Sequence, residues 1–195
     1  MSSTFLLVLH TTTIEFQKVL EAESTYYKLL REYWYEYNFL TPTWWMLLLL
    51  TIITPIIWWI LLDKTKIFEV ITYGLFLGTI ATILDSIGTK MMLWTYPIRL
   101  SPYLFPQFYP YDIALVIIPY MFIYQWVTHT KRFIVVAILL AAFVSYVAEP
   151  FFQWTGAYQT ITWKHIYSFV IYPLIAIFTK FVMIFLSKKS ARNHP

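Results

Sequence analysis

Acidic residues are scarce after the first 42 residues of this sequence, and three of them stand at the ends of long apolar stretches. Asp85 and Glu149 each follow a long apolar stretch, and Asp112 begins another. Carboxyl groups that lie close together can act as general acids and bases. If the protein is an enzyme, we therefore expect Asp85, Asp112 and Glu149 to be its catalytic residues.

Basic and aromatic residues surround these three positions in the sequence. Lysine and arginine can bind a phosphate headgroup, and tryptophan and tyrosine favour the depth of lipid headgroups. The predicted ligand-binding set is Lys90, Trp94, Tyr96, Arg99, Trp154, Trp163, Lys164 and His165.

Carboxylate oxygens suit Mg²⁺, Mn²⁺ or Ca²⁺, but no run of residues has metal-ligand spacing. We expect no cofactor and assign no metal ligand, with a divalent cation as the alternative.

Composition indicates that a membrane positions these residues. Apolar residues make up 59% of the 195, charged residues 12%, and the mean hydropathy is +0.63. A soluble fold of this size cannot hide so much apolar surface. Five stretches approach the roughly 20 residues that cross a bilayer, at about 43–62, 67–89, 112–127, 133–149 and 166–186. The predicted fold is an all-α integral membrane protein with five transmembrane helices after an amphipathic N-terminal helix.

The basic residues predict the orientation. The turns at 63–66 and 128–132 and the tail at 188–195 are basic, and such segments face the cytoplasm. The N-terminal arm, residues 1–42, is then outside the cell, the bundle is 43–187, and the C-terminus is cytoplasmic. The net charge of +4 reflects these turns and does not indicate nucleic-acid binding.

This topology brings the three carboxyl groups to one end of the bundle. Asp85 lies 18 residues after Ile67, about 27 Å along a helix, and Glu149 lies 16 after Phe133, about 24 Å. One interpretation is a binding or catalytic site. The other is a set of ion pairs and caps, with Asp112 capping the third helix after Pro110 and Pro150 ending the fourth.

Two aromatic, proline-containing loops, 93–111 and 150–165, join the spans at this end. They are too apolar for solvated linkers, so we expect them to fold back over the bundle. They form either a lid over a pocket or an aromatic girdle at the membrane surface.

The arm has a different pattern. Residues 14–38 carry Phe16, Leu20, Tyr27 and Trp34 at helical spacing among polar residues, which predicts an amphipathic helix. The helix lies against the bundle or membrane surface, or it binds a partner membrane protein or a second copy.

Two resemblances follow from this series of motifs. The sequence carries a series of six short motifs: Asp85-Ser-Ile-Gly-Thr89, Trp94-Thr-Tyr-Pro97, Pro110-Tyr-Asp112, Tyr124-Gln125, Glu149-Pro150 and Trp163-Lys-His-Ile-Tyr-Ser168. This series resembles a family of small, uncharacterised polytopic membrane proteins of spore-forming Gram-positive bacteria. The resemblance covers about residues 43–186 and implies a bacterial plasma membrane. A fainter likeness is to membrane-embedded lycopene-type carotenoid cyclases, although Glu149-Pro150 departs from their Pro-Glu-Glu order. That likeness implies acid catalysis without a metal.

Three functions fit these observations. The first is binding of a lipid or a partner membrane protein through a polar pocket under the aromatic loops. The second is an enzyme that modifies a lipid or isoprenoid by carboxylate acid–base chemistry. The third is a transporter or channel subunit.

Overall fold

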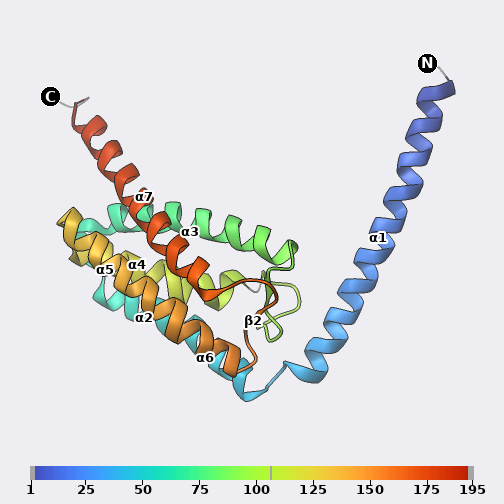
Figure 1. Cartoon of the computed structure of the whole chain (residues 1–195), viewed down its shortest axis with the longest axis horizontal. Helices are drawn as coiled ribbons and strands as arrows, with labels where there is room; N and C mark the ends of the chain where they lie inside the picture. The colour runs from blue at the N-terminus through green and yellow to red at the C-terminus, as the bar shows by residue number, and fades with distance from the viewer. Residues whose placement is uncertain (1–2, 106, 193–195) are drawn as a thin grey trace.

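The structure, a computed structural model, describes residues 3–105 and 107–192, with side chains for 14–105 and 110–189. Its elements are almost all helical. They are α1 (Ser3–Tyr37), α2 (Pro42–Leu61), η1 (Lys64–Lys66), α3 (Ile67–Lys90), β1 (Trp94–Thr95), η2 (Gln107–Ile117), α4 (Ile118–Trp126), α5 (Thr130–Phe143), η3 (Val144–Ala148), α6 (Glu149–Trp154), β2 (Gln159–Thr160) and α7 (His165–Arg192). Figure 1 shows the bundle that α2 to α7 form, with α1 projecting from it.

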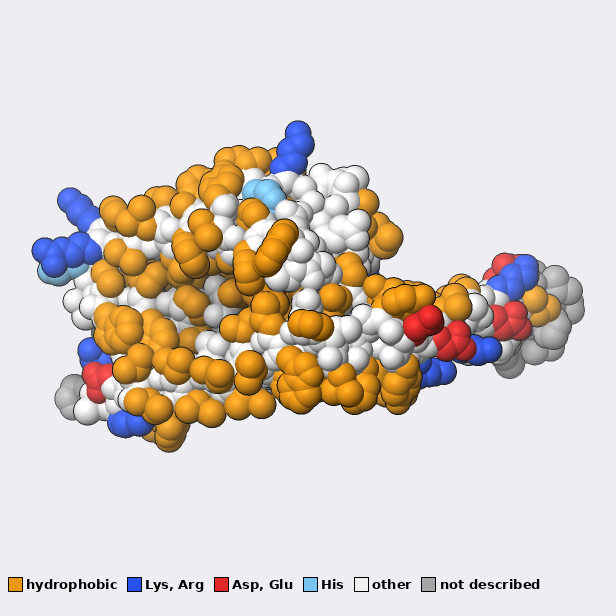
Figure 2. Space-filling model, turned by 90° about the horizontal axis from the view of Figure 1, so that it is seen from below, with side chains coloured by type: hydrophobic (Ala, Val, Ile, Leu, Met, Phe, Trp, Pro, Cys, Tyr) orange, Lys and Arg blue, Asp and Glu red, His pale blue; other side chains and the backbone are white. Residues whose placement is uncertain are grey.

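Four helices in the described residues are long and apolar enough to cross a membrane: Pro42–Leu61, Lys64–Lys90, Thr130–Trp154 and His165–Lys189. Their large apolar side chains cover the outside of the bundle, for example Ile60, 71% exposed, and Phe68, 85% exposed. Lysine and arginine side chains gather at one end of this apolar surface (Figure 2). Exposure on this scale is stable only against lipid, and the protein is therefore membrane-embedded.

A further helical stretch, η2 followed by α4, forms the centre of the bundle. It packs against α2, α3 and α5, and its residues 114, 116, 118, 120 and 121 are buried. Hydrogen bonds fix both of its ends: Asp112 accepts from Thr82, and Gln125 accepts from the backbone N–H of Asp63. The stretch begins at Gln107, five residues before the predicted 112.

The fourth predicted span continues past the point where the sequence placed its end. Pro150 does not terminate the helix at Glu149, because α6 runs on to Trp154. A π-helical turn, η3, precedes the proline, and the backbone N–H of Glu149 donates to the carbonyl of Val144, five residues earlier. The wider turn accommodates the proline ring, which clashes with an ordinary α-helical turn.

Helix α1 begins at Ser3, earlier than the predicted 14. Among its described side chains, 14–37, those of the last turns contact the bundle. Side chains 14–29 are exposed on every face, so this part of the arm does not pack against the bundle. At its end, buried Trp34 donates through Nε1 to the Arg99 carbonyl, 2.8 Å away. Buried Asn38 accepts from the Arg99 backbone N–H at 2.9 Å. Two hydrogen bonds thus tie the arm to the loop after α3.

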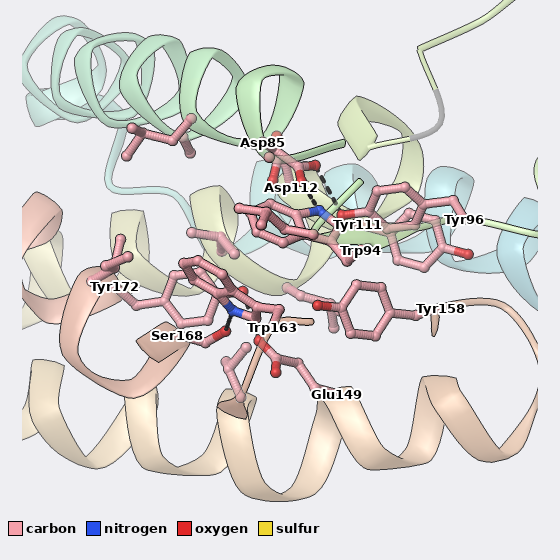
Figure 3. Close-up of a pocket in the computed structure, with 18 of the residues that line it drawn as sticks. Asp85, Trp94, Tyr96, Tyr111, Asp112, Glu149, Tyr158, Trp163, Ser168 and Tyr172 are labelled. Atoms are coloured by element: carbon pink, nitrogen blue, oxygen red, sulfur yellow. Dashed lines mark hydrogen bonds between the residues drawn. The ribbon is translucent and has the colours of Figure 1, made fainter. Parts of the chain in front are cut away.

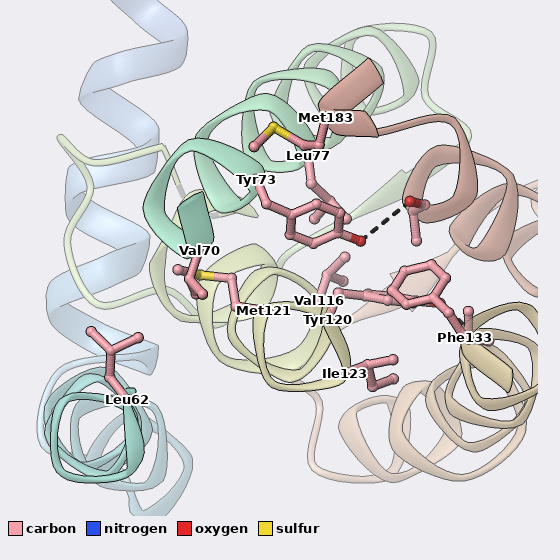
Figure 4. Packing of buried hydrophobic residues seen from close by; sticks show 12 residues of the cluster. Leu62, Val70, Tyr73, Leu77, Val116, Tyr120, Met121, Ile123, Phe133 and Met183 are labelled. Atoms are coloured by element: carbon pink, nitrogen blue, oxygen red, sulfur yellow. Dashed lines mark hydrogen bonds between the residues drawn. The ribbon is translucent and has the colours of Figure 1, made fainter. Parts of the chain in front are cut away.

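The main core joins α3, α4, α5 and α7 through large aromatic residues (Figure 4). Tyr73 donates to the Ala176 carbonyl at 3.3 Å, and Tyr120 donates to the Ala137 carbonyl at 3.1 Å. Gly74 and Gly78 let η2 and α4 approach α3 closely. A Cβ at Gly78 would lie 2.7 Å from the Cδ1 atom of Ile117.

The variant Gly78→Leu tests this close approach. The added side chain cannot fit against Ile117, and we expect a loss of about 1–3 kcal/mol in unfolding free energy. Thermal or denaturant unfolding in detergent measures it. Thr79→Leu adds the same side chain at the neighbouring, exposed position and should change little. Equal effects of the two variants would contradict the packing described.

Candidate functional site

The two aromatic loops are joined to each other at one end of the bundle. Strands β1 and β2 pair antiparallel, with Trp94 opposite Thr160. The Leu93 carbonyl accepts from the backbone N–H of Ile161 at 2.9 Å. The rings of Trp94 and Trp163 therefore lie edge to face, with centroids 4.7 Å apart. Nothing in the sequence predicted this pairing, because two-residue strands leave no periodic pattern.

Beneath the joined loops lies a cavity of about 230 Å³. Its walls come from α3, η2, α7, the α5–α6 stretch and both loops (Figure 3). Its polar and aromatic lining residues are Asp85, Trp94, Tyr96, Tyr111, Asp112, Glu149, Phe152, Tyr158, Trp163, Ser168 and Tyr172. Leucine, isoleucine, valine, alanine and glycine form the rest, so an apolar cavity holds three carboxyl groups from three separate helical stretches.

Asp85, on α3, is held by two side chains of the loop that follows. The Trp94 indole N–H donates to Oδ1, and the Tyr96 hydroxyl donates to Oδ2 at 2.8 Å (Figure 3). Burial raises the pKa of Tyr96 well above its usual value, and the nearby Asp85 charge adds to the shift. Tyr96 therefore keeps its proton and remains a donor. Asp85 itself is only 7% exposed.

Trp94 reaches Asp85 only because α3 has a glycine beneath the ring. A Cβ at Gly88 would lie 2.0 Å from the indole carbon Cη2 of Trp94. The side chain of any other residue would displace the ring. Gly88 thus positions the donor of Asp85.

Asp112 lies within the π-helix η2 and has the fewest partners of the three carboxyl groups. Thr82 donates to its Oδ2 at 3.2 Å, and no other described residue donates to either oxygen. The possible role of Asp112 as the N-terminal cap of the third helix is wrong, because η2 begins at Gln107. Its side chain forms part of the cavity wall instead.

Glu149 belongs to a hydrogen-bonded network that extends out of the cavity. Tyr172 donates to its Oε1 at 2.9 Å, and Nδ1 of His165 lies 2.5 Å from its Oε2. Nε2 of His165 lies 3.2 Å from Oε1 of Gln153, whose amide nitrogen donates to Thr160 at 2.8 Å. Gln153 therefore presents an acceptor to Nε2, which must carry a proton.

The structure separates the predicted ligand-binding residues into two groups. Trp94, Tyr96 and Trp163 line the cavity, and His165 adjoins it through Glu149. The others do not line it: Lys90 and Lys164 are exposed, Trp154 is 82% exposed, and the Arg99 guanidinium donates to the Tyr96 carbonyl at 2.9 Å. The loops therefore form both a cover over the cavity and an outward-facing aromatic surface.

Several lining residues were not predicted. They are Tyr111, Phe152, Tyr158, Ser168 and Tyr172. Ser168 accepts from the Trp163 indole at 2.9 Å. A signal existed for two of them, because His165, Ser168 and Tyr172 recur at helical spacing and share one face of α7. Tyr111 donates to the Ala157 carbonyl at 2.8 Å, a contact 46 residues away that sequence spacing cannot show.

Within the described residues, no group of three or more histidine, cysteine, aspartate or glutamate side chains is placed to hold a metal ion. Comparisons with known protein families, with curated proteins and with solved structures find no match. The function is therefore argued from the geometry of the cavity.

The variant Gly88→Ala tests the support of the Trp94–Asp85 contact. The added methyl group displaces the ring and leaves Asp85 without one donor, so we expect a loss of about 1–3 kcal/mol in unfolding free energy. Gly74→Ala is the matched control on α3, since its Cβ meets the flexible side chain of Met121. Unfolding in detergent compares them. A Gly88→Ala protein as stable as the control would show that the contact is not needed.

Proposed function

We propose that this protein crosses a bacterial plasma membrane five times, with its N-terminus outside and its C-terminus in the cytoplasm. The stretch η2–α4 runs between the two ends of the bundle, which supports a fifth crossing. Lysine and arginine residues at 63–66 and 128–132 lie at the end opposite the cavity, and basic turns mark the cytoplasmic side. The cavity then belongs to the outer half of the bilayer.

The proposed function is binding of a lipid or another membrane-soluble amphiphile in this cavity. The observation that carries it is the position of two lining residues on α3. Leu84 and Ile87 line the cavity and are also 42% and 49% exposed on the apolar outside of the bundle. The cavity therefore borders the lipid-facing surface, and a ligand can reach it from the membrane.

The size of the cavity limits what it holds. Its 230 Å³ far exceeds the roughly 15 Å³ that one water requires. It is nevertheless smaller than the pockets of about 300–1,000 Å³ that enclose whole drug-sized ligands. The cavity accommodates a headgroup and the first part of a chain, with the remainder of the chain in the bilayer.

Native mass spectrometry of the purified full-length protein tests this function. We expect a copurified lipid or isoprenoid, and we expect Ala81→Phe to reduce its occupancy at least about tenfold, because Ala81 lines the cavity and the ring fills it. Ile83→Phe is the control: Ile83 is 55% exposed and lies outside the cavity. A wild-type protein without bound ligand, or equal occupancy in both variants, would contradict the proposal.

A second candidate function is acid–base catalysis on the bound molecule, and the Glu149–His165 contact favours it. Glu149 faces the cavity and contacts Nδ1 of His165 at 2.5 Å, while Tyr172 and Gln153 hold the two partners. Such a pair can give a proton to a bound molecule or take one from it. No metal ligand is required.

Comparison of membrane lipids from producing cells tests the catalytic candidate. If the protein is an enzyme, the wild type forms a product that Glu149→Gln does not form, while ligand binding persists. Glu69→Gln changes the same residue type at the opposite end, where Glu69 accepts from Tyr124, and should retain the product. Identical lipid profiles for the wild type and Glu149→Gln would rule out this role of Glu149.

A further inference from the structure

The cavity has charged side chains of one sign only. Asp85, Asp112 and Glu149 line it, and none of the described residues in its wall is lysine or arginine. The nearby cations are engaged or directed elsewhere: Lys90 and Lys164 are exposed, and the Arg99 guanidinium bonds to the Tyr96 carbonyl. An anionic headgroup would meet the Asp85 and Asp112 carboxyl groups with no lysine or arginine in the described wall to bind it, so a phosphate ligand does not suit this wall.

Asp112 is the carboxyl group with unused acceptor capacity. Asp85 accepts from two donors, and Glu149 contacts Tyr172 and His165. Asp112 is only 7% exposed, yet among described residues it receives one hydrogen bond, from Thr82 to Oδ2. Buried polar groups in native proteins normally have partners, and a carboxylate at membrane depth is costly without one. Its other oxygen accepts from none of the described residues, and because Asp112 lines the cavity, this indicates a donor supplied by the ligand.

Aromatic rings complete the surroundings that a cation requires. Trp94 and Trp163 lie with ring centroids 4.7 Å apart, Tyr96 and Tyr111 with centroids 4.5 Å apart, and all four line the cavity. Ring faces attract an ammonium group, most strongly where water is excluded. Carboxylate and aromatic groups together favour a ligand that combines positive charge with an apolar chain.

We propose that the cavity binds the ammonium head of an apolar amine, with Asp112 as its principal acceptor. This inference rests on the proposed function and specifies its ligand. The ammonium N–H groups donate to the free oxygen of Asp112, the rings surround the charge, and the chain leaves between Leu84 and Ile87 into the bilayer. A free long-chain amine and the ammonium of an ethanolamine lipid share this chemistry.

Binding of a matched series of single-chain molecules tests the proposal. Dodecylamine, dodecanol and dodecyl phosphate are titrated into the full-length protein in nonionic detergent, with bound mass read by native mass spectrometry. Ala81→Phe, with its filled cavity, corrects for uptake by the micelle. We expect dodecylamine to bind at least about tenfold more tightly than dodecanol, and dodecyl phosphate to bind most weakly. A lysophosphatidylethanolamine then distinguishes the sources: tighter binding than dodecylamine indicates a lipid headgroup, weaker binding a free amine.

The variant Asp112→Asn assigns the acceptor. It should lose the preference for amine over alcohol while still binding dodecanol, and that retained binding shows that it is folded. Asp63→Asn, at the opposite end of the bundle, should leave the preference unchanged. If Asp112→Asn does not fold, the wild-type comparison still decides the ligand class.

The outcomes separate the two proposals. Equal binding of amine and alcohol by the wild type, or a preference for phosphate, overturns the ammonium inference and leaves the binding function standing. No binding of any molecule beyond that of Ala81→Phe overturns both. A preference that persists in Asp112→Asn overturns the role of Asp112.

Discussion

The need to satisfy carboxyl groups inside an apolar bundle determines the architecture of one whole end of this protein. A membrane supplies no water to these groups, so each must find donors within the fold or in a ligand. Asp85 takes its donors from Trp94 and Tyr96, and Glu149 contacts Tyr172 and His165. These contacts draw the aromatic loops over the bundle and leave a cavity beneath them. Asp112 is the exception, because among the described residues only Thr82 donates to it.

The same contacts connect the projecting helix α1 to the site. Trp34 and Asn38 bond to the backbone of Arg99, the Arg99 guanidinium bonds to the Tyr96 carbonyl, and the Tyr96 hydroxyl bonds to Asp85. The loop between α3 and η2 is therefore held from both sides, by the arm and by a carboxyl group of the cavity. This explains how a proline-rich segment with little regular structure presents Trp94 and Tyr96 to Asp85 in a defined position.

Much of this arrangement was predictable from the sequence, because helix length and apolar runs place residues along a helix axis. The convergence of Asp85 and Glu149 followed from rise per residue, and that of Asp112 from its position at the start of the next span. Features that depend on the rotation of each helix about its axis, or on pairing between loops, could not be predicted. They are the β1–β2 pairing, the π-helical turns before Glu149 and around Asp112, and the position of Tyr158 in the cavity wall. Lysine and arginine residues close to the site in sequence suggested phosphate binding. Proximity in sequence does not show where a side chain points, and Lys90 and Lys164 are exposed. The helical spacing of the arm predicted an apolar face but not what that face contacts, and side chains 14–29 are exposed.

Photolabelling tests most directly whether the cavity takes up a molecule from the membrane. The full-length protein in lipid nanodiscs is irradiated with a diazirine-bearing single-chain lipid, and labelled residues are mapped by mass spectrometry. Binding in the cavity predicts label on buried wall residues such as Val144 and Tyr158, in addition to the lipid-facing side chains. Replacement of Ala81 by phenylalanine should remove the label on these buried residues alone. Label confined to the outer surface of the bundle, and unchanged by that replacement, would contradict the account.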